Sequence, residues 1–376
     1  MNRNLAFILL LVLLVSAYSY SCTSNQKNKL LSITVIEDVS LNDIPFSASQ
    51  IQTKLDTNQP AYSYFSFFNP DDNALGIAYI EESRTQYITM PLKFMNKRRG
   101  SADFYVHSFD SIFYFDRDLS GIFLFDTSGK IIDQYSIDPA YPPNPLTSHF
   151  FTFSDALYYS WIPETDKGSD NSRKQMFETT APICRVELNH SAQSSGSPML
   201  FGTYPDNYKT GKDYYNYSPN IFIGLQNEII NSYESSHHLF IYKDSTLFAE
   251  KICRSNFIKE FKDIPDEEFS NLSFIKQYLG EEPKYTQLIA DPFRNCYYRA
   301  VKLRMKTDGL SLKDAKWSII VLNADFDVIG EAAMPYADYM PDIIVPSRKG
   351  VYIKRSPKSK EEFYGDLKLS LIQFEL

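Results

Sequence analysis

The feature that most constrains the fold of this chain is a hairpin pattern that recurs along its length. Residues 122–125 form an apolar run, residues 126–129 are Asp-Thr-Ser-Gly, and residues 130–137 form a second strand-like run. Two such runs on either side of turn-forming residues indicate a β-hairpin. Similar hairpins begin near residues 77, 122, 183, 239, 319 and 351.

Six hairpins spread over a chain of 376 residues predict an all-β propeller with six blades of antiparallel strands. Propeller blades recur at about 40–50 residues, and insertions account for the longer intervals. A sandwich of this length would form two separate domains. The content of 27 Tyr and 28 Phe agrees with a strand-rich fold. We therefore expect one domain at residues 31–376, with residues 31–39 and 367–376 sharing the blade that closes the ring.

The segments between the hairpins differ in character. Residues 163–180 and 204–220 are polar and are predicted to be loops. In residues 255–279, apolar side chains recur every three to four positions with an interruption at Pro265, which predicts one or two short helices. No other segment of the sequence has a sustained helical pattern. The run at residues 122–125 is apolar at every position, as expected of a strand buried on both faces between stacked blades.

The N-terminal residues predict export. Arg3 precedes an apolar run at residues 5–17, and the small residues Ser19 and Ser21 precede Cys22. A positive start, a short apolar stretch and small residues before a cleavage point are typical of a signal peptide. The apolar run is shorter than the roughly 20 residues of a membrane span, although a permanent anchor helix is the alternative. We expect residues 1–21 to be the signal peptide.

Cys22 suggests a lipid anchor. The sequence at residues 19–22 resembles a loose bacterial lipobox, in which the cysteine becomes the lipidated first residue, although Ser19 stands where an aliphatic residue is usual. Residues 22–30 are then a lipid-anchored tether, and the membrane is a partner through the N-terminal lipid. The predicted location is the bacterial cell envelope, facing the periplasm. Cleavage without lipidation would instead leave a soluble periplasmic protein.

Four residues are weak candidates for metal ligands. Asp116 and Asp118 begin a D-x-D-x-S-G sequence like that of a calcium loop, but Thr127 stands where an EF-hand needs a glutamate. These aspartates lie between strand-like runs, where they favour an ordinary turn. His237 and His238 open a predicted strand, so their imidazoles should point to opposite faces. We therefore predict no metal site.

No catalytic residue is predicted either. The sequence has no nucleophile elbow, phosphate-binding loop or dinucleotide fingerprint, so no cofactor is expected. A formal net charge of -8 also argues against a nucleic-acid partner, since such partners need basic patches.

A cluster of tyrosines is the candidate ligand-binding feature. Tyr214, Tyr215 and Tyr217 lie in the predicted loop at residues 204–220. Aromatic rings on exposed loops offer rigid contact area to a glycan or to another envelope protein. The alternative is that these rings fold back over the edges of the blades.

Three cysteines follow Cys22, and they cannot all pair with one another: Cys184, Cys253 and Cys296. Their spacing fits no metal motif. An exported protein can form one disulfide, and buried free thiols are the alternative that the sequence leaves open.

Several of these features together resemble a known family. The lipobox-like start, the hairpins and the segments at residues 295–300 and 349–354 resemble a family of uncharacterised Bacteroidetes lipoproteins. It is a domain-of-unknown-function family related to six-bladed β-propeller lipoproteins. The resemblance implies a fold and an envelope location, and it brings no catalytic residues to this chain.

The leading hypothesis for function is a non-catalytic binding or scaffolding propeller anchored in the envelope. The alternative is a propeller hydrolase or lactonase-like enzyme with a metal or carboxylates in the central channel. A third hypothesis is a sensor or partner subunit that docks another envelope protein, which an exposed apolar patch would support.

Overall fold

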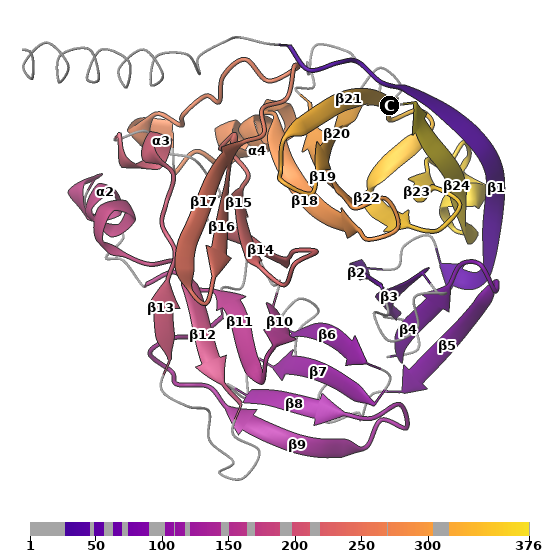
Figure 1. Ribbon diagram of the computed structural model, residues 1–376, viewed down its shortest axis with the longest axis horizontal. Coiled ribbons are helices and arrows are strands. Elements are labelled where there is room, and N and C mark those ends of the chain that lie inside the picture. Colours follow the sequence, from indigo (N-terminus) through magenta and orange to yellow (C-terminus); the bar gives the residue numbers. More distant parts are fainter. Residues whose placement is uncertain are drawn as a thin grey trace, which may run out of the picture.

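The chain forms six four-stranded antiparallel sheets arranged in a ring (Figure 1). The predicted six-bladed β-propeller is therefore confirmed. The computed structural model describes residues 27–45, 49–55, 63–69, 74–89, 102–108, 110–116, 121–143, 150–163, 170–188, 198–210, 219–268, 270–303 and 316–375.

Each blade is a meander whose first strand lies nearest the axis of the ring. Blade 1 contains β2 (Ser49–Leu55), β3 (Ser63–Asn69), β4 (Ala74–Tyr79) and β5 (Arg84–Thr89). Blade 2 contains β6 (Ala102–Ser108), β7 (Ser111–Asp116), β8 (Gly121–Phe125) and β9 (Ile131–Ser136). Blade 3 contains β10 (Phe150–Phe153), β11 (Ala156–Ser160), β12 (Ile183–Glu187) and β13 (Met199–Phe201).

The second half of the ring is built in the same way. Blade 4 contains β14 (Pro219–Ile223), β15 (Ile229–Tyr233), β16 (His238–Lys243) and β17 (Thr246–Ile252). Blade 5 contains β18 (Lys284–Asp291), β19 (Cys296–Lys302), β20 (Lys316–Asn323) and β21 (Val328–Pro335). Blade 6 contains β22 (Tyr339–Pro346), β23 (Val351–Arg355), β24 (Asp366–Glu375) and, as its outermost strand, β1 (Ser32–Pro45).

Blade 6 joins the two ends of the chain. β1 pairs antiparallel with β24, from Ser32 opposite Glu375 to Leu41 opposite Leu367. Leu41 and Leu367 are also both buried in one apolar cluster. The expectation that the N-terminal and C-terminal strands share a blade is confirmed. This pairing removes the exposed edge that an open ring would leave on β24.

Apolar side chains fill the spaces between the blades. Phe123 and Phe125 of β8 pack in a cluster with strands of blade 1, whereas Ile122 and Leu124 pack in a cluster with strands of blade 3. Every residue of β8 is buried. The strand is thus interior on both faces, as its continuous apolar sequence predicts.

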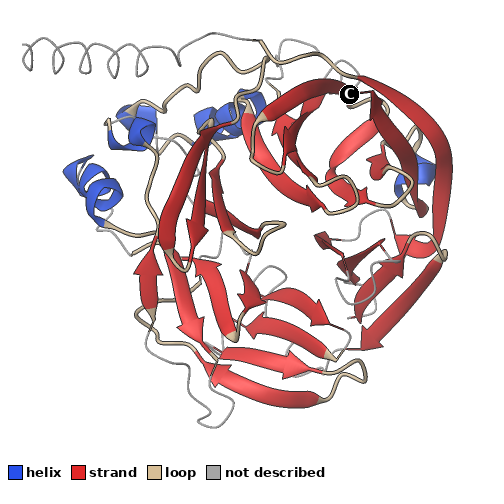
Figure 2. Cartoon of the chain, viewed as in Figure 1, coloured by secondary structure: helices blue, strands red, loops and turns tan. Residues whose placement is uncertain are grey.

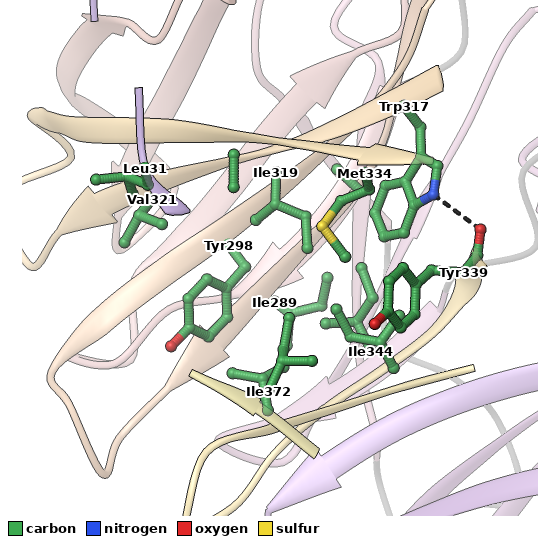
Figure 3. Packing of buried hydrophobic residues seen from close by; sticks show 14 of the residues in the cluster. Leu31, Ile289, Tyr298, Trp317, Ile319, Val321, Met334, Tyr339, Ile344 and Ile372 are labelled. Carbon is green, nitrogen blue, oxygen red and sulfur yellow. Dashed lines mark hydrogen bonds between the residues drawn. The ribbon is translucent and has the colours of Figure 1, made fainter. Parts of the chain in front are cut away.

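The same packing joins blades 5 and 6. Trp317 of β20 is fully buried and donates a hydrogen bond from its Nε1 to the carbonyl oxygen of Tyr339, at 2.9 Å (Figure 3). Met334 lies beside the indole in the same cluster. The hydrogen bond satisfies the one polar atom of a side chain that is otherwise apolar.

The helices at residues 170–179 and 206–209 lie outside the ring of sheets (Figure 2). The helical insertion predicted at residues 255–279 contains the 3₁₀ turn η2 (Asp266–Glu268) and the helix α4 (Leu272–Glu281). Asn271 caps α4 by accepting hydrogen bonds from the backbone N–H groups of Ser273 and Phe274. The helix content of this insertion was correctly predicted. Within the described residues, no helix is long and apolar enough to cross a membrane.

Two predictions about the insertions were wrong. Residues 163–180 were expected to be a loop, but they contain the helix α2 (Asp170–Thr179), and the loop at residues 204–220 begins with the short helix α3 (Asp206–Lys209). Met176 and Phe177 of α2 are buried, and the Phe177 ring lies 5.6 Å from that of Tyr208 in α3. Packing against α3 therefore stabilises a helix whose own sequence is mostly polar. A further short helix, α5 (Lys360–Phe363), precedes β24.

The two-sided burial of β8 leads to a prediction about stability. Phe123→Ala and Phe125→Ala should each lower the free energy of unfolding by about 3–5 kcal/mol, because each leaves a cavity between blades 1 and 2. Ile132→Ala on β9 is the control, since Ile132 is 52% exposed and should change stability by less than about 0.5 kcal/mol. Equilibrium unfolding in urea measures all three. Neutral effects of both phenylalanine substitutions would contradict the interior position of β8.

Candidate functional site

The predicted site residues fall partly outside the described part of the chain. Asp116 is the last residue of β7. His237 immediately precedes β16, and His238 is its first residue. The lipidation candidate, the three tyrosines and the second aspartate lie outside the described residues: Cys22, Tyr214, Tyr215, Tyr217 and Asp118.

His237 and His238 have different neighbours. The Nδ1 atom of His237 lies 2.6 Å from the hydroxyl oxygen of Tyr285 in blade 5, whereas Nδ1 of His238 lies 2.5 Å from a carboxylate oxygen of Glu250 on β17. The two imidazoles thus do not converge on one point. Among the described residues, no group of three or more His, Cys, Asp or Glu side chains is placed to hold a metal ion.

One extensive buried polar cluster among the described residues centres on Arg299 of β19. Its side chain is completely buried, and its Cζ atom lies 3.4 Å from the centroid of the Tyr285 ring. The guanidinium donates hydrogen bonds of 2.9–3.1 Å to the carbonyl oxygens of Ser236, His237 and Cys253 and to the hydroxyl of Ser232. Arg299 therefore fastens three segments of blade 4 to blade 5. Carbonyl dipoles and the face of the tyrosine ring offset the cost of burying its charge.

The ionisable groups beside Arg299 are unsuited to acid–base catalysis. Burial, together with the positive charges of Arg254 and Arg299, lowers the pKa of His237 to about 3. Burial raises the pKa of the Cys253 thiol to about 11. At neutral pH the imidazole is uncharged and the thiol is protonated, so neither is poised near the pH where a general acid or a nucleophile works best. The geometry and the protonation states indicate a structural joint.

The other cysteines have the same character. Cys184, Cys253 and Cys296 are all buried and free. Burial raises the pKa of Cys184 and of Cys296 to about 11 as well. Of the two alternatives that the sequence left open, the structure has buried free thiols.

A buried carboxylate fixes the segment that leads to the N-terminus. Glu331 of β21 is fully buried, and its carboxylate accepts 2.6 Å hydrogen bonds from the hydroxyls of Ser255 and Ser318 and from the backbone N–H of Asn256. Its backbone pairs with the incoming chain, because its N–H donates to the carbonyl of Lys29 and its carbonyl accepts from the N–H of Leu31. Residues 29–31 thus lie along the outer edge of blade 5.

Asn28 and Asn256 complete this junction. The backbone N–H of Asn28 donates to the side-chain oxygen of Asn256 at 2.7 Å, and the Asn256 side chain donates back to the carbonyl of Asn28 at 2.9 Å. The side chain of Asn28 also donates to the carbonyl of Arg254 at 2.6 Å. These bonds hold the chain just before β1 against the segment that follows β17. We call this contact, made by Asn28, Asn256 and Glu331, the N-terminal junction.

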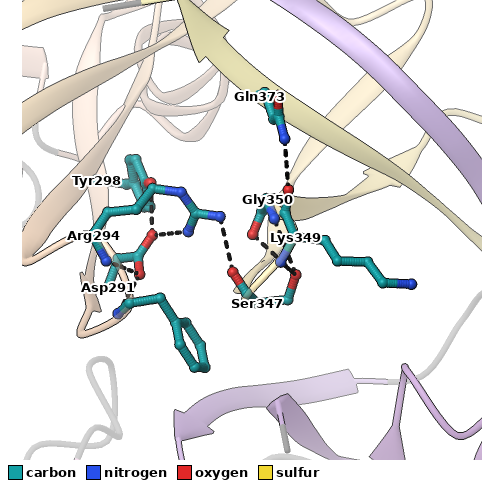
Figure 4. A network of polar contacts seen from close by, with 8 residues as sticks. Asp291, Arg294, Tyr298, Ser347, Lys349, Gly350 and Gln373 are labelled. Carbon is teal, nitrogen blue, oxygen red and sulfur yellow. Dashed lines mark hydrogen bonds and ion pairs between the residues drawn. The ribbon is translucent and has the colours of Figure 1, made fainter. Parts of the chain in front are cut away.

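The network in Figure 4 joins blades 5 and 6 at the turn between β18 and β19. Asp291 is fully buried, and its carboxylate forms an ion pair with Arg294 at 2.5 Å and accepts a hydrogen bond from the hydroxyl of Tyr298 at 2.7 Å. Arg294 also donates to the carbonyl of Ser347 in blade 6, at 2.9 Å. These four residues form hydrogen bonds and an ion pair with one another, so this network also connects two blades.

The inner strands carry a further ion pair. Nζ of Lys354 on β23 lies 2.6 Å from a carboxylate oxygen of Asp342 on β22, and the lysine side chain is only 4% exposed, whereas that of Asp342 is 42% exposed. Gln287 of β18 donates to the carbonyl of Asp342. The buried ammonium of Lys354 is thus paired with the more exposed carboxylate of Asp342.

Arg299, Glu331 and the N-terminal junction were not found from the sequence. One signal for them was present. Arg299 and Glu331 are charged residues inside otherwise apolar strand sequences, at residues 297–301 and 329–334. Such charges are almost never fully buried unless they are paired or hydrogen-bonded, so their positions mark polar contacts between elements distant in the sequence.

Comparison with known proteins agrees with this fold. The family described as "Domain of unknown function (DUF4221)" matches residues 98–333. The chain belongs to this family. The inferred resemblance to a domain-of-unknown-function family with the propeller fold is therefore confirmed. Comparison with curated protein sequences gives no match.

Two solved structures from Bacteroides have the same fold. A DUF4221 member from Bacteroides vulgatus has a TM-score of 0.72 and 17% sequence identity, and the match covers 93% of this chain and 99% of that one. A putative exported protein from Bacteroides fragilis has a TM-score of 0.51 and 11% identity, covering 94% of this chain and 98% of that one. At these identities the likeness shows the propeller fold alone.

The partly buried imidazole of His237 predicts a loss of stability in mild acid. Its pKa is about 3 in the fold against an ordinary value of 6.5, so the unfolded chain binds a proton that the folded chain does not. The free energy of unfolding should therefore fall as the pH decreases from about 6.5. Between about pH 7 and about pH 5, this one group should account for a loss of about 2 kcal/mol.

Urea unfolding at the two pH values measures this effect. His237→Asn should lack the part of the pH dependence that comes from His237. His238→Asn keeps the imidazole of His237 and should therefore keep that part. An equal pH dependence in the parent chain and in His237→Asn would contradict the burial of a neutral imidazole.

Proposed function

We propose that this DUF4221 member is an exported, lipid-anchored envelope protein that acts as a non-catalytic binding or scaffolding propeller. The observation that carries the proposal is the N-terminal junction. Residues 28–31, which follow the lipidation candidate Cys22 closely, are hydrogen-bonded to blades 4 and 5. A lipid on Cys22 would thereby be connected to a rigid ring rather than to a loose domain. The fold of a putative exported protein from Bacteroides fragilis is consistent with export.

The buried ionisable groups favour binding over catalysis. Arg299, Glu331 and Asp291 are fully buried and are occupied in joining elements of the ring. His237 is uncharged at neutral pH and contacts Tyr285. The lowered pKa of His237 arises from burial and nearby positive charges, and it lies far below the operating pH of a general acid or base.

The tyrosine-bearing segment is the proposed ligand contact. It begins after α3, where Tyr208 is fully buried, and it ends at β14, where Pro219 and Asn220 are buried. Its ends are thus fixed at the outer side of the ring and at an inner strand (Figure 1). We propose that Tyr214, Tyr215 and Tyr217, carried between these fixed points, bind a glycan or another envelope protein through their aromatic rings.

Lipidation is tested at Cys22. Cys22→Ala removes the acceptor thiol, so the protein should move from the membrane fraction to the soluble periplasmic fraction of its host cell. Ser24→Ala is the matched control, because it changes the same segment and keeps the thiol. Fractionation followed by immunoblotting measures the partition. Unchanged membrane association of Cys22→Ala would exclude the lipid anchor.

Ligand contact is tested by photo-crosslinking in intact cells. A photoreactive phenylalanine analogue in place of Tyr215 should form discrete adducts with a protein or glycan of the envelope, whereas the same analogue in place of the exposed Ile132 on β9 should not. Equal crosslinking at both positions, or none at Tyr215, would contradict the proposed contact. A divalent cation retained in stoichiometric amount through dialysis would support the hydrolase alternative instead.

A further inference from the structure

Exposed apolar side chains surround the N-terminal junction. Leu30 is 67% exposed and follows directly on the residue that pairs with Glu331. Ile252, at the end of β17, is 62% exposed, and Phe257, next to Asn256, is 41% exposed. All three are within two residues of an atom that takes part in the junction, so they gather around one point on the outside of the ring. Large apolar side chains gathered on a surface mark a site of contact with a protein or a membrane.

Apart from the buried Glu331, the two segments that form the junction carry charges opposite in sign to that of the whole chain, up to the exposed Glu260 that follows them. Residues 27–31 and 252–259 include the cations Lys27, Lys29, Arg254 and Lys259 and contain no Asp or Glu. All four cations are exposed. The chain as a whole has a formal net charge of -8. A basic, partly apolar surface on an acidic protein is complementary to an anionic lipid surface, which attracts each nearby Lys or Arg by about 1 kcal/mol.

The length of the preceding segment limits what this surface can meet. Cys22 is six residues before Asn28. Six residues reach at most about 20 Å when fully extended, at 3.3–3.6 Å per residue. An acyl chain on Cys22 would therefore keep the junction close to the bilayer. The membrane is thus the partner that the anchor itself would place next to this surface.

We propose that the tether-side surface, made of Leu30, Ile252, Phe257, Lys27, Lys29, Arg254 and Lys259, rests on the anionic face of the membrane. The proposal rests on the lipid anchor proposed above. β17 and β21 are the outermost strands of blades 4 and 5, so this surface lies on the rim of the ring (Figure 1). The propeller then stands edge-on to the bilayer, and both faces of the ring remain open to ligands.

Quenching by brominated lipids tests this orientation. The chain purified from its host is reconstituted into vesicles of phosphatidylethanolamine and phosphatidylglycerol with brominated acyl chains, which quench only a nearby indole. Phe257→Trp is compared with Ile132→Trp, which places an indole on the outer strand of blade 2. After the emission of Trp161 and Trp317 in the parent chain is subtracted, the indole introduced by Phe257→Trp should lose at least about twice as large a fraction of its fluorescence as that of Ile132→Trp. Equal loss at both positions, or none, would overturn the proposal and favour a protein as the occupant.

The same system tests the role of the charges. Adding Arg254→Glu and Lys259→Glu to Phe257→Trp should at least halve the quenching, and Lys130→Glu, a charge reversal beside β9, should leave it unchanged. High salt should weaken the quenching because it screens exposed charges. Equal quenching with and without the two reversals would exclude a lipid contact based on these cations.

A failure of the anchor can be told apart from a failure of the orientation. The intact mass of the purified chain shows whether acyl chains are attached. If none is attached, the export-processed chain is coupled through its Cys22 thiol to a maleimide lipid in the same vesicles, since the other three cysteines are buried. The quenching experiment then proceeds unchanged. A negative mass result contradicts the anchor, and equal quenching at the two indoles contradicts the orientation.

Discussion

The structure depends on apolar packing between blades, because no blade can cover its own two faces. β8 illustrates this dependence: its phenylalanines belong to the interior shared with blade 1, while Ile122 and Leu124 belong to the interior shared with blade 3. Each sheet is therefore stable only when both of its neighbours are in place. A ring satisfies this requirement for every blade at once, whereas an open stack would leave two apolar faces in water.

Buried polar contacts then decide how neighbouring blades are aligned. Apolar packing alone would let neighbouring blades slide past each other. Arg299 of blade 5 contacts the backbone of blade 4 at three carbonyl groups. Arg294 of blade 5, which is paired with Asp291, contacts the carbonyl of Ser347 in blade 6. A shift between blades would leave these charges without partners in a medium of low dielectric constant, at a cost of several kcal/mol each. Glu331 extends the same principle to the N-terminal segment. The contacts between blades 4 and 5 thus also determine where the N-terminal segment joins the ring.

The sequence was sufficient to predict the architecture. Continuous apolar runs and turn residues identified the hairpins, and the apolar periodicity of residues 255–279 identified α4, since both signals are local. α2 was missed because only Met176 and Phe177 of its sequence are buried apolar residues, and adjacent positions give no helical period. Its stability comes from α3, a contact that the sequence does not display.

The candidate sites were predicted less well, for a related reason. His237 and His238 were expected to point to opposite faces of a strand, and the structure shows that their imidazoles have different neighbours. The N-terminal junction joins Asn28 to Asn256, more than two hundred residues apart, so it needed the three-dimensional structure. The parts of the function that depend on Cys22 and on the three tyrosines stay predictions.

The pairing of the N-terminal strand β1 with the C-terminal strand β24 in blade 6 has a consequence for how the protein folds. β1 is made before β24, so the hydrogen bonds between them cannot form until β24 has been synthesised. Contacts between residues this far apart in sequence are typical of slow folding. During that interval the unpaired edge of β1 could pair with other chains. Chaperones and proteases would therefore encounter this edge first, and loss of β24 would leave the molecule in that state.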